Sequence, residues 1–234
     1  MQGMTYKLIF TLVLIVIISS FSSSLSQVPL SSCSVLNDDN KEYVLTSNLT
    51  SSLTCITIDA DNVVLNGNGY VISGNNKREE SGVYAKSNSD IVIENIEINN
   101  FYTGIEIESS NNIEIRNVEI HNSKSAIHFI ATADSLINEV NAQSSDIGVL
   151  LTTSSNNQVS NSIMENNEIG IKLSVSSDNF VKNNKIMHNT NYGILLDSSS
   201  YNNIMNNVLD DNKKGLVMKQ SLNNVVSEIS IINS

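Results

Sequence analysis

Acidic side chains are the groups in this sequence best suited to chemistry, and they are regularly spaced. Glu97 and Glu119 are separated by about 22 residues, a spacing typical of repeat proteins, while Glu106 and Glu108 alternate with apolar residues. Glycoside hydrolysis uses two carboxylates about 5 to 10 Å apart, and lyase chemistry pairs a calcium-binding acidic cluster with a base. Glu97 and Glu119 would meet that distance in a chain that coils with the same period. Because apolar residues alternate with them and no basic or aromatic residue accompanies them, we predict solvent-facing strand residues and no catalytic site.

The two cysteines, Cys33 and Cys55, have the same separation as Glu97 and Glu119. Stacked neighbours about 4.8 Å apart satisfy the Cα separation that a disulfide tolerates. We therefore predict a disulfide, which would add about 3 kcal/mol in the loop-entropy model. The alternative is a two-thiolate metal site, but neither a CxxC spacing nor an adjacent histidine supports it. Asn48 begins the one N-glycosylation sequon and is a candidate glycosylation site.

The elements that must position these residues repeat along the chain. A small residue recurs with a period of about 22 residues, at Gly82, Gly104, Ala126, Gly148, Gly170, Gly193 and Gly215. The interval from Gly170 to Gly193 is longer than the others by a single residue. The first and third residues after the small residue are apolar, which is the pattern of a strand with one buried face. Short strands at this spacing, with no helix to cross between them, do not form an ordinary parallel sheet, but they can coil.

We therefore predict an all-β fold, a single-stranded right-handed parallel β-helix of about seven to eight turns of about 22 residues. Residues 62–234 form the repeats, and residues 27–61 are expected to cap the N-terminal end. The insertion GNNKREE at residues 74–80 carries four charges and is interpreted as a solvated loop. The last turn has no polar cap, so we expect a homo-oligomer or a partner that covers the open C-terminal end.

Asparagine is abundant, with 36 residues, and it falls into columns. One column holds Asn95, Asn117, Asn161, Asn183 and Asn206, and another holds Asn100, Asn122, Asn166 and Asn189. Stacked amides can hydrogen-bond along a column, and asparagine tolerates the left-handed conformation of a corner. We predict that these columns are corners of the coil, with a polar recognition strip as the alternative.

Histidine and methionine are the remaining candidate metal ligands. The repeat places His121 and His188 in one column but three turns, or about 14 Å, apart, too far for a shared metal. His128 is expected to face outwards between two buried positions. Met164 and Met187 are expected to stack, and thioethers can bind Cu(I), but the apolar residues of their column favour core packing. We predict no metal or cofactor site.

The N-terminus has the layout of a signal peptide over residues 1–26. Lys7 precedes the apolar run LIFTLVLIVII, and Ser24-Leu25-Ser26 fits a small-x-small cleavage site. This run of eleven residues, apolar apart from Thr11, falls short of the roughly 20 that span a bilayer. We predict cleavage, no membrane span afterwards, and a secreted, extracellular or cell-envelope protein, with a retained anchor as the alternative. A net charge of −11 with only two arginines argues against nucleic acid as a partner.

Three runs of the sequence resemble the NosD-type repeat of right-handed parallel β-helix proteins: NNIEIRNVEIHNSKSAIHF, NNQVSNSIMENNEIGIKL and NNIMNNVLDDNKKGLVM. The resemblance covers residues 33–231 and implies the fold and an association with carbohydrate. The wider pectate-lyase-like superfamily includes polysaccharide lyases, hydrolases and epimerases, but the Asn-Thr-Asp, Gly-His-Gly and Arg-Ile-Lys motifs of polygalacturonases are missing here. No catalytic residue transfers, and fold alone does not establish function.

The function expected from these observations is that of a secreted or cell-surface, non-catalytic β-helix, either with a structural role or with weak binding of polysaccharide or envelope proteins. Two alternatives stay open. One is a polysaccharide-active enzyme, whose site would need an acidic pair beside Lys or Arg. The other is a NosD-like copper-handling protein of the periplasm, which would use the Met164 and Met187 thioethers.

Overall fold

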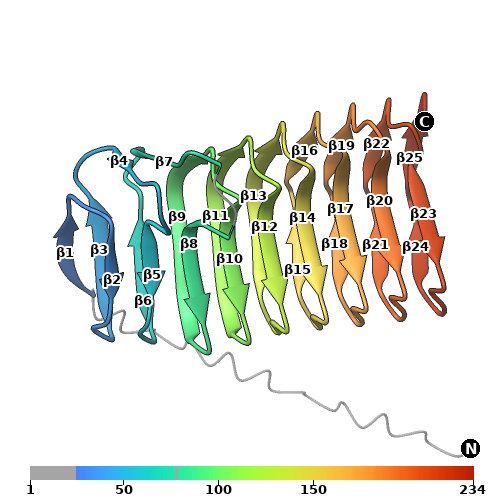
Figure 1. Ribbon diagram of the computed structural model, residues 1–234. Helices are drawn as coiled ribbons and strands as arrows, with labels where there is room; N and C mark the ends of the chain where they lie inside the picture. The colour runs from blue at the N-terminus through green and yellow to red at the C-terminus, as the bar shows by residue number, and fades with distance from the viewer. Residues whose placement is uncertain (1–24, 77–78) are drawn as a thin grey trace, which may run out of the picture.

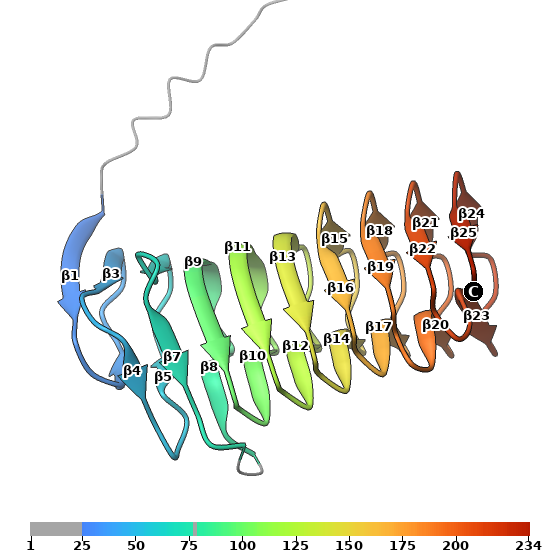
Figure 2. The ribbon, with the colours of Figure 1, turned by 90° about the horizontal axis from the view of Figure 1, so that it is seen from above.

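The computed structural model describes residues 25–76 and 79–234, which form a parallel β-helix (Figures 1 and 2). The strand pairs are parallel and join equivalent residues of successive turns, as Ile115 joins Ile93 and Ile137. The predicted coil is therefore confirmed. Most of the predicted signal peptide, and Lys77 and Arg78 of the insertion, lie outside the described residues. Within the described ranges, no helix is long and apolar enough to cross a membrane.

One wall of the coil is a nine-stranded sheet with one strand from each turn. Its strands are, in spatial order, β2 (Ser34–Leu36), β5 (Ile56–Ile58), β8 (Ser81–Lys86), β10 (Thr103–Glu108), β12 (Ser125–Ile130), β14 (Ile147–Thr152), β17 (Ile169–Ser174), β20 (Tyr192–Asp197) and β23 (Leu216–Lys219).

The other walls form one bent sheet of 16 strands. Its main path is β1 (Ser26–Leu30), β3 (Lys41–Leu45), β6 (Val63–Asn66), β9 (Ser89–Asn99), β11 (Asn111–His121), β13 (Leu136–Gln143), β15 (Gln158–Ser160), β18 (Phe180–Lys182), β21 (Asn203–Met205) and β24 (Val225–Ser227). Its branches are β4 (Leu49–Thr50) with β7 (Val71–Ser73), and β16 (Ile163–Glu165), β19 (Lys185–Met187), β22 (Val208–Asp210) and β25 (Ser230–Ile232).

The nine strands of the first sheet correspond to about nine turns, slightly more than the seven to eight predicted. The difference arises at the N-terminal end, where β1 and β3 stack on β6 while β2 and β5 stack on β8. The residues before the regular repeats therefore also coil, although their spacing is less even.

The core consists of the apolar columns that the repeat predicts. Ile105 and Ile107 of β10, like their equivalents Ile127 and Phe129 of β12, are fully buried. The small-residue column faces this core closely, since a Cβ at Gly104 would lie 2.5 Å from the carbonyl oxygen of Ala126. Close approach between successive turns therefore explains why this column excludes larger side chains.

Corners of the coil are formed by residues in the left-handed conformation, at four positions in a complete turn. In one turn these are Ser109, Asn112, Asn117 and Asn122, with φ of 52°, 55°, 50° and 54°. The Nδ2 of Asn117 donates a hydrogen bond to Oδ1 of Asn95 over 2.7 Å. The two columns that hold Asn117 and Asn122 are thus corners, as predicted.

Three predicted alignments are wrong because the extra residue of one repeat lies between Asn189 and Tyr192. His188, with φ 54°, occupies the corner position predicted for Asn189, which is buried. His188 consequently does not share the column of His121, which aligns with Gln143.

Met164 and Met187 do not stack either, for the same reason. Met164 aligns with Ile186 in the core, while Met187 aligns with Glu165. Counting back from the glycine therefore misplaces residues 187 to 189 by one position.

Buried polar ladders follow the corners on the inside of the coil. Asn184 is 2% exposed, its Oδ1 accepts the N–H of Ser162 over 3.1 Å, and its Nδ2 donates to the carbonyl of Val159 and to Oδ1 of Asn207 over 3.0 Å each. The longest ladders include Ser135, Asn157, Asn179, Asn202 and Asn224, and Ser123, Ser145, Asn167, Asn189, Asn212 and Ser234. These side chains satisfy backbone N–H groups that the bends remove from the sheets.

Cys33 and Cys55 form the predicted disulfide across the first two turns, with Cα atoms 4.6 Å apart. Asn48 is exposed directly before β4 at the same end, and its Oδ1 accepts the N–H of Val71 over 3.0 Å. Glycosylation at Asn48 stays a prediction.

Candidate functional site

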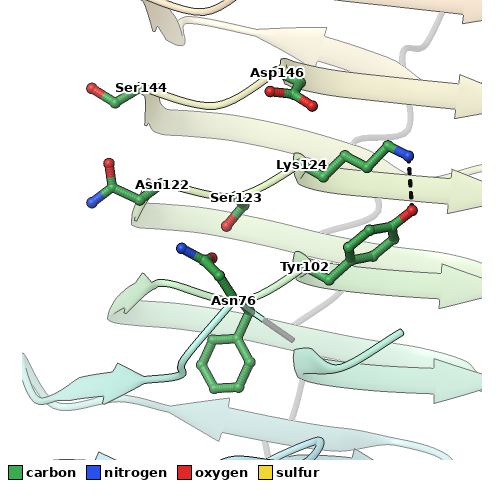
Figure 3. A pocket seen from close by; sticks show the side chains of 8 residues that line it. Asn76, Tyr102, Asn122, Ser123, Lys124, Ser144 and Asp146 are labelled. Atoms are coloured by element: carbon green, nitrogen blue, oxygen red, sulfur yellow. Dashed lines mark hydrogen bonds between the residues drawn. The ribbon is translucent and has the colours of Figure 1, made fainter. Parts of the chain in front are cut away.

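A corner groove runs along the start of β10, β12 and β14, where the chain enters the nine-stranded sheet (Figure 3). It encloses about 340 Å³ and is lined by Asn76, Phe101, Tyr102, Asn122, Ser123, Lys124, Ser144 and Asp146. Tyr102, Lys124 and Asp146 come from successive turns, one residue before each strand, so the stacking of the coil places them in a row.

Tyr102 and Lys124 form the centre of the corner groove. The Nζ of Lys124 donates a hydrogen bond to the Tyr102 hydroxyl oxygen over 2.8 Å and lies 4.9 Å from the centre of its ring. The side chain of Lys124 is exposed and that of Tyr102 is half-buried. Since the phenol accepts from the ammonium group, its own O–H proton is directed elsewhere and is available to a ligand.

The insertion of residues 74–80 contributes one wall of the corner groove through Asn76. With its amide nitrogen facing the neighbouring turns, Asn76 donates to the carbonyl oxygens of Phe101 over 3.2 Å and Asn122 over 2.8 Å. Glu80, at the end of the insertion, accepts a hydrogen bond from Thr54 over 3.3 Å. The insertion is therefore attached to the coil beside the groove.

The outer face of the nine-stranded sheet continues from the corner groove. Tyr84, Glu106 and His128 lie in register on β8, β10 and β12. Glu106 accepts a hydrogen bond from the hydroxyl of Ser81 over 2.8 Å. Glu106 and His128 are both predicted from the sequence to face outwards, and the structure brings them next to each other.

A second carboxylate on this outer face, Glu108, is held by two partners. Lys86 Nζ lies 2.7 Å from one oxygen, and the Tyr84 hydroxyl donates to the other over 3.0 Å. The hydrogen bond from Lys86 lowers the pKa of Glu108. Burial, together with the charge and hydrogen bond of Glu108, raises the pKa of Tyr84 to about 12. Glu108 thus stays ionised and Tyr84 protonated at neutral pH.

His128 is the most perturbed histidine. Burial lowers its pKa to about 4, and its Nε2 lies 3.0 Å from the hydroxyl of Thr152. The imidazole is therefore neutral at pH 7, with one hydrogen bond to the neighbouring turn.

Glu97 and Glu119, the carboxylates with the expected spacing, align on β9 and β11 of the bent sheet. The prediction that no basic residue accompanies them is wrong, because Nε2 of His121 lies 3.5 Å from Oε1 of Glu119. Alternation places His121 two residues after Glu119 on the same face of the strand, a neighbour that column-by-column comparison overlooks. Asn141 and Gln143 also donate to the same Glu119 oxygen, each over 3.3 Å.

The described ranges contain no group of three or more His, Cys, Asp or Glu residues arranged to hold a metal ion. Met164 is fully buried in the core. The paired thioether site considered from the sequence is not formed, since Met187 aligns with Glu165.

Sequence reasoning missed Tyr102, Lys124 and Asp146 as a set. A signal was present, because the residue two before the small residue is polar or aromatic in each of these turns. It went unused because this position lies on a corner, where no strand alternation marks a side chain as exposed.

The fold of the chain recurs in solved structures of alginate and mannuronan epimerases and of a bacteriophage tailspike protein. The periplasmic alginate epimerase AlgG aligns over 88% of this chain and 76% of its own, at 14% identity and a TM-score of 0.58. The enzymatically active domain of bacteriophage CBA120 tailspike protein 2 aligns over 88% of this chain and 43% of its own, at 12% identity and a TM-score of 0.59. The mannuronan C-5 epimerase AlgE4 A-module of Azotobacter vinelandii gives 13% identity, a TM-score of 0.51, and coverages of 88% and 87%. At these identities the likeness concerns the fold.

No curated protein matches the sequence. The family model described as "Periplasmic copper-binding protein (NosD)" matches residues 60–233. These residues make up most of the chain and include all of the regular turns, so the chain belongs to the NosD family of parallel β-helix proteins.

Proposed function

We propose that this protein binds polysaccharide, without cleaving it, at the corner groove and along the adjoining outer face of the nine-stranded sheet. The observation that carries the proposal is the Tyr102–Lys124 pair, which offers an aromatic ring, a free phenol proton and an ammonium group in one hollow. Asn122 and Ser144, both exposed, add an amide and a hydroxyl group. A hollow with one aromatic surface among hydrogen-bonding groups suits the alternating apolar and hydroxyl surfaces of a sugar.

The relatives of the fold support this class of ligand. The names of AlgG and AlgE4 describe epimerases of alginate or mannuronan. Binding without cleavage is favoured because Glu108 is already held by Lys86 and Tyr84, and Glu106 by Ser81. The hydrogen bond from Lys86 also lowers the pKa of Glu108, which makes this carboxylate a weaker base toward a substrate proton.

An extracellular or cell-envelope location accompanies this proposal. It is supported by the signal-peptide layout, by the Cys33–Cys55 disulfide, which persists in oxidising compartments, and by the word "periplasmic" in the names of both the family and AlgG.

The test is binding of the full chain to a neutral glucan, a galactomannan and polygalacturonate, measured by calorimetry. We expect at least one to bind, and we expect the Tyr102→Ala and Lys124→Ala variants to lose about tenfold in affinity, or about 1.4 kcal/mol. Lys185→Ala, which removes another exposed lysine on β19 of the bent sheet, is the matched control. Full affinity in the Tyr102→Ala variant would refute the corner groove as the site.

A polysaccharide-active enzyme is the second candidate, favoured by one observation. The neutral imidazole of His128 lies in register with the carboxyl group of Glu106 on the outer face, so two side chains that can exchange protons are neighbours there. New reducing ends, unsaturated products or changed sugar configuration, all abolished by His128→Ala, would establish it over the non-catalytic proposal.

The family description names copper, but the described residues do not fit a copper site. Met164 has no exposed surface, Met187 belongs to another column, and no cluster of three His, Cys, Asp or Glu residues stands near either in the described part of the chain. We therefore assign no copper chemistry to this chain.

A further inference from the structure

We propose that the C-terminal half of the outer face holds a subsite for an anionic group of the polysaccharide, a carboxylate or a sulfate ester, at Tyr192, Lys214 and Lys219. This inference rests on the proposed function and specifies the ligand further. The subsite lies on β20 and β23, the orange and red strands near the C-terminal end in Figure 1.

Two ammonium groups converge on one aromatic ring at this subsite. Nζ of Lys214 is 5.4 Å from the centre of the Tyr192 ring, and Nζ of Lys219 is 5.2 Å from it. Lys214 precedes β23 and Lys219 ends it, so the ring lies along the outer face between the two ends of that strand. Both lysines are exposed.

Neither lysine is neutralised within the protein. In the described part of the chain, no carboxylate oxygen lies within 4.0 Å of either Nζ. Asp197 is aligned with Lys219 by the strand register but makes no ion pair with it. Glu168, the acid of the turn before Tyr192, accepts from Asn191 over 3.3 Å.

Two like charges drawn to one ring repel each other, and a ring–cation contact at an exposed site offsets only about 0.5 to 1 kcal/mol. An anion beside the ring would relieve this repulsion. Lys172, which faces outwards on β17 in register with Leu195, adds a third positive charge nearby. Such a concentration of positive charge is unusual in a chain of net charge −11, so the geometry favours an anionic ligand here over a neutral one.

The subsite is close enough to the corner groove for one oligosaccharide to contact both. The strands β12, β14, β17 and β20 are consecutive in the nine-stranded sheet. Three strand spacings separate the turn of Lys124 from that of Tyr192, which amounts to about 14 Å. An oligosaccharide that fills the corner groove and runs across the strands would present its next sugars to Tyr192.

The test compares oligosaccharides that differ only in charge, using calorimetry on the full chain. Hexagalacturonate is paired with its methyl ester, and a sulfated galactan hexasaccharide, which carries no carboxylate, with its desulfated form. The variant is Lys214→Gln with Lys219→Gln, and Lys213→Gln with Lys185→Gln is a control with the same change in net charge. We expect the first pair of substitutions to weaken binding of one charged oligosaccharide about tenfold, with little effect on its neutral partner. Loss confined to hexagalacturonate assigns a carboxylate, and loss confined to the sulfated galactan assigns a sulfate ester.

The subsite is refuted if the variant binds both charged oligosaccharides as tightly as the native protein does. It is also refuted if the variant loses as much affinity for the neutral oligosaccharides as for the charged ones. A second measurement separates this failure from failure of the corner groove. Galacturonate and sulfate, added as small ions, should shift the backbone amide signals of Tyr192, Lys214 and Lys219 in NMR spectra of the native protein and not of the variant. These ions do not need the corner groove, so absence of the shifts refutes the subsite even if Tyr102→Ala abolishes polysaccharide binding.

Discussion

Replacement of Asn184 by alanine should destabilise the protein far more than replacement of its neighbour Asn183. Asn184 is buried, and its side chain accepts the N–H of Ser162 and donates to the carbonyl of Val159. Asn183 is exposed at the corner, with φ 58°. The two substitutions therefore separate the inner ladder from the outer corner with adjacent residues.

The magnitude follows from the hydrogen bonds that Asn184→Ala removes. The Ser162 N–H is left buried without a partner, which costs about 1 to 3 kcal/mol, and the loss of the bonds from Nδ2 to the Val159 carbonyl and to Oδ1 of Asn207 adds about 1 kcal/mol. The backbone N–H of residue 184 still donates to Oδ1 of Asn207 over 3.0 Å in the variant. The substitution therefore leaves a backbone N–H without a partner only in the turn of Ser162. We expect a loss of roughly 3 kcal/mol. Asn183→Gly should cost less than about 1 kcal/mol, because glycine adopts the left-handed conformation freely.

Urea unfolding followed by circular dichroism measures both values, with the slope m compared among variants because repeat proteins can unfold in parts. A loss of unfolding free energy below about 1 kcal/mol for Asn184→Ala, or equal losses for the two variants, would show that the ladder side chains are not needed as hydrogen-bond acceptors for the backbone N–H groups of the bends.

Four other outcomes are expected. Cys33→Ser with Cys55→Ser should lower the unfolding free energy by about 3 kcal/mol, since the disulfide closes a separation of 22 residues; an unchanged urea midpoint would contradict this. The folded-state pKa of His128 is about 4, below its ordinary value, so the unfolded chain binds the proton first and stability falls as pH drops from about 6.5 to 4. That loss is at most about 3 kcal/mol and should shrink in His128→Gln, measured by urea unfolding at several pH values. Gly170→Ala should destabilise, because its Cβ would lie 2.5 Å from Ile186 Cγ2 and 2.7 Å from the Gly193 carbonyl; an unchanged thermal midpoint would show that the turns can separate. Val225 of β24 and Ile231 of β25 are each 53% exposed, so we expect light scattering on this chain to find an assembly through these apolar side chains; a monomer at all concentrations would contradict this expectation.

The columns of the fold were predictable from sequence, because in-register stacking imposes one character on each position. Ile105 and Ile127 show this in the core, and Asn95 and Asn117 at a corner. Where one turn has an extra residue, the longer interval between the small residues shows that a residue has been added, but it does not show at which position of the turn. The exchange of His188 for Asn189, and of Ile186 for Met187, followed from that gap.

The candidate site was less predictable, because it depends on contacts between side chains of different turns. Lys124 reaches back to the Tyr102 hydroxyl, and Lys214 and Lys219 both reach Tyr192. The stacking of turns makes such pairs neighbours, but the direction of a long side chain is set by local packing. Asn184 shows the same limit inside the coil, where the sequence alone does not distinguish a buried asparagine from the exposed one beside it.

The single added residue between Asn189 and Tyr192 bears on how such molecules diversify. The coil accommodates it at one bend, and the strands on either side keep their pairing, Ile186 with Leu209 and Ile194 with Leu216. The longer insertion that carries Asn76 sits at the bend on the same side of an earlier turn. Lengthening at these bends changes the rim of the groove without disturbing the stack, so new ligand specificities can arise by small insertions while the framework that supports them is inherited intact.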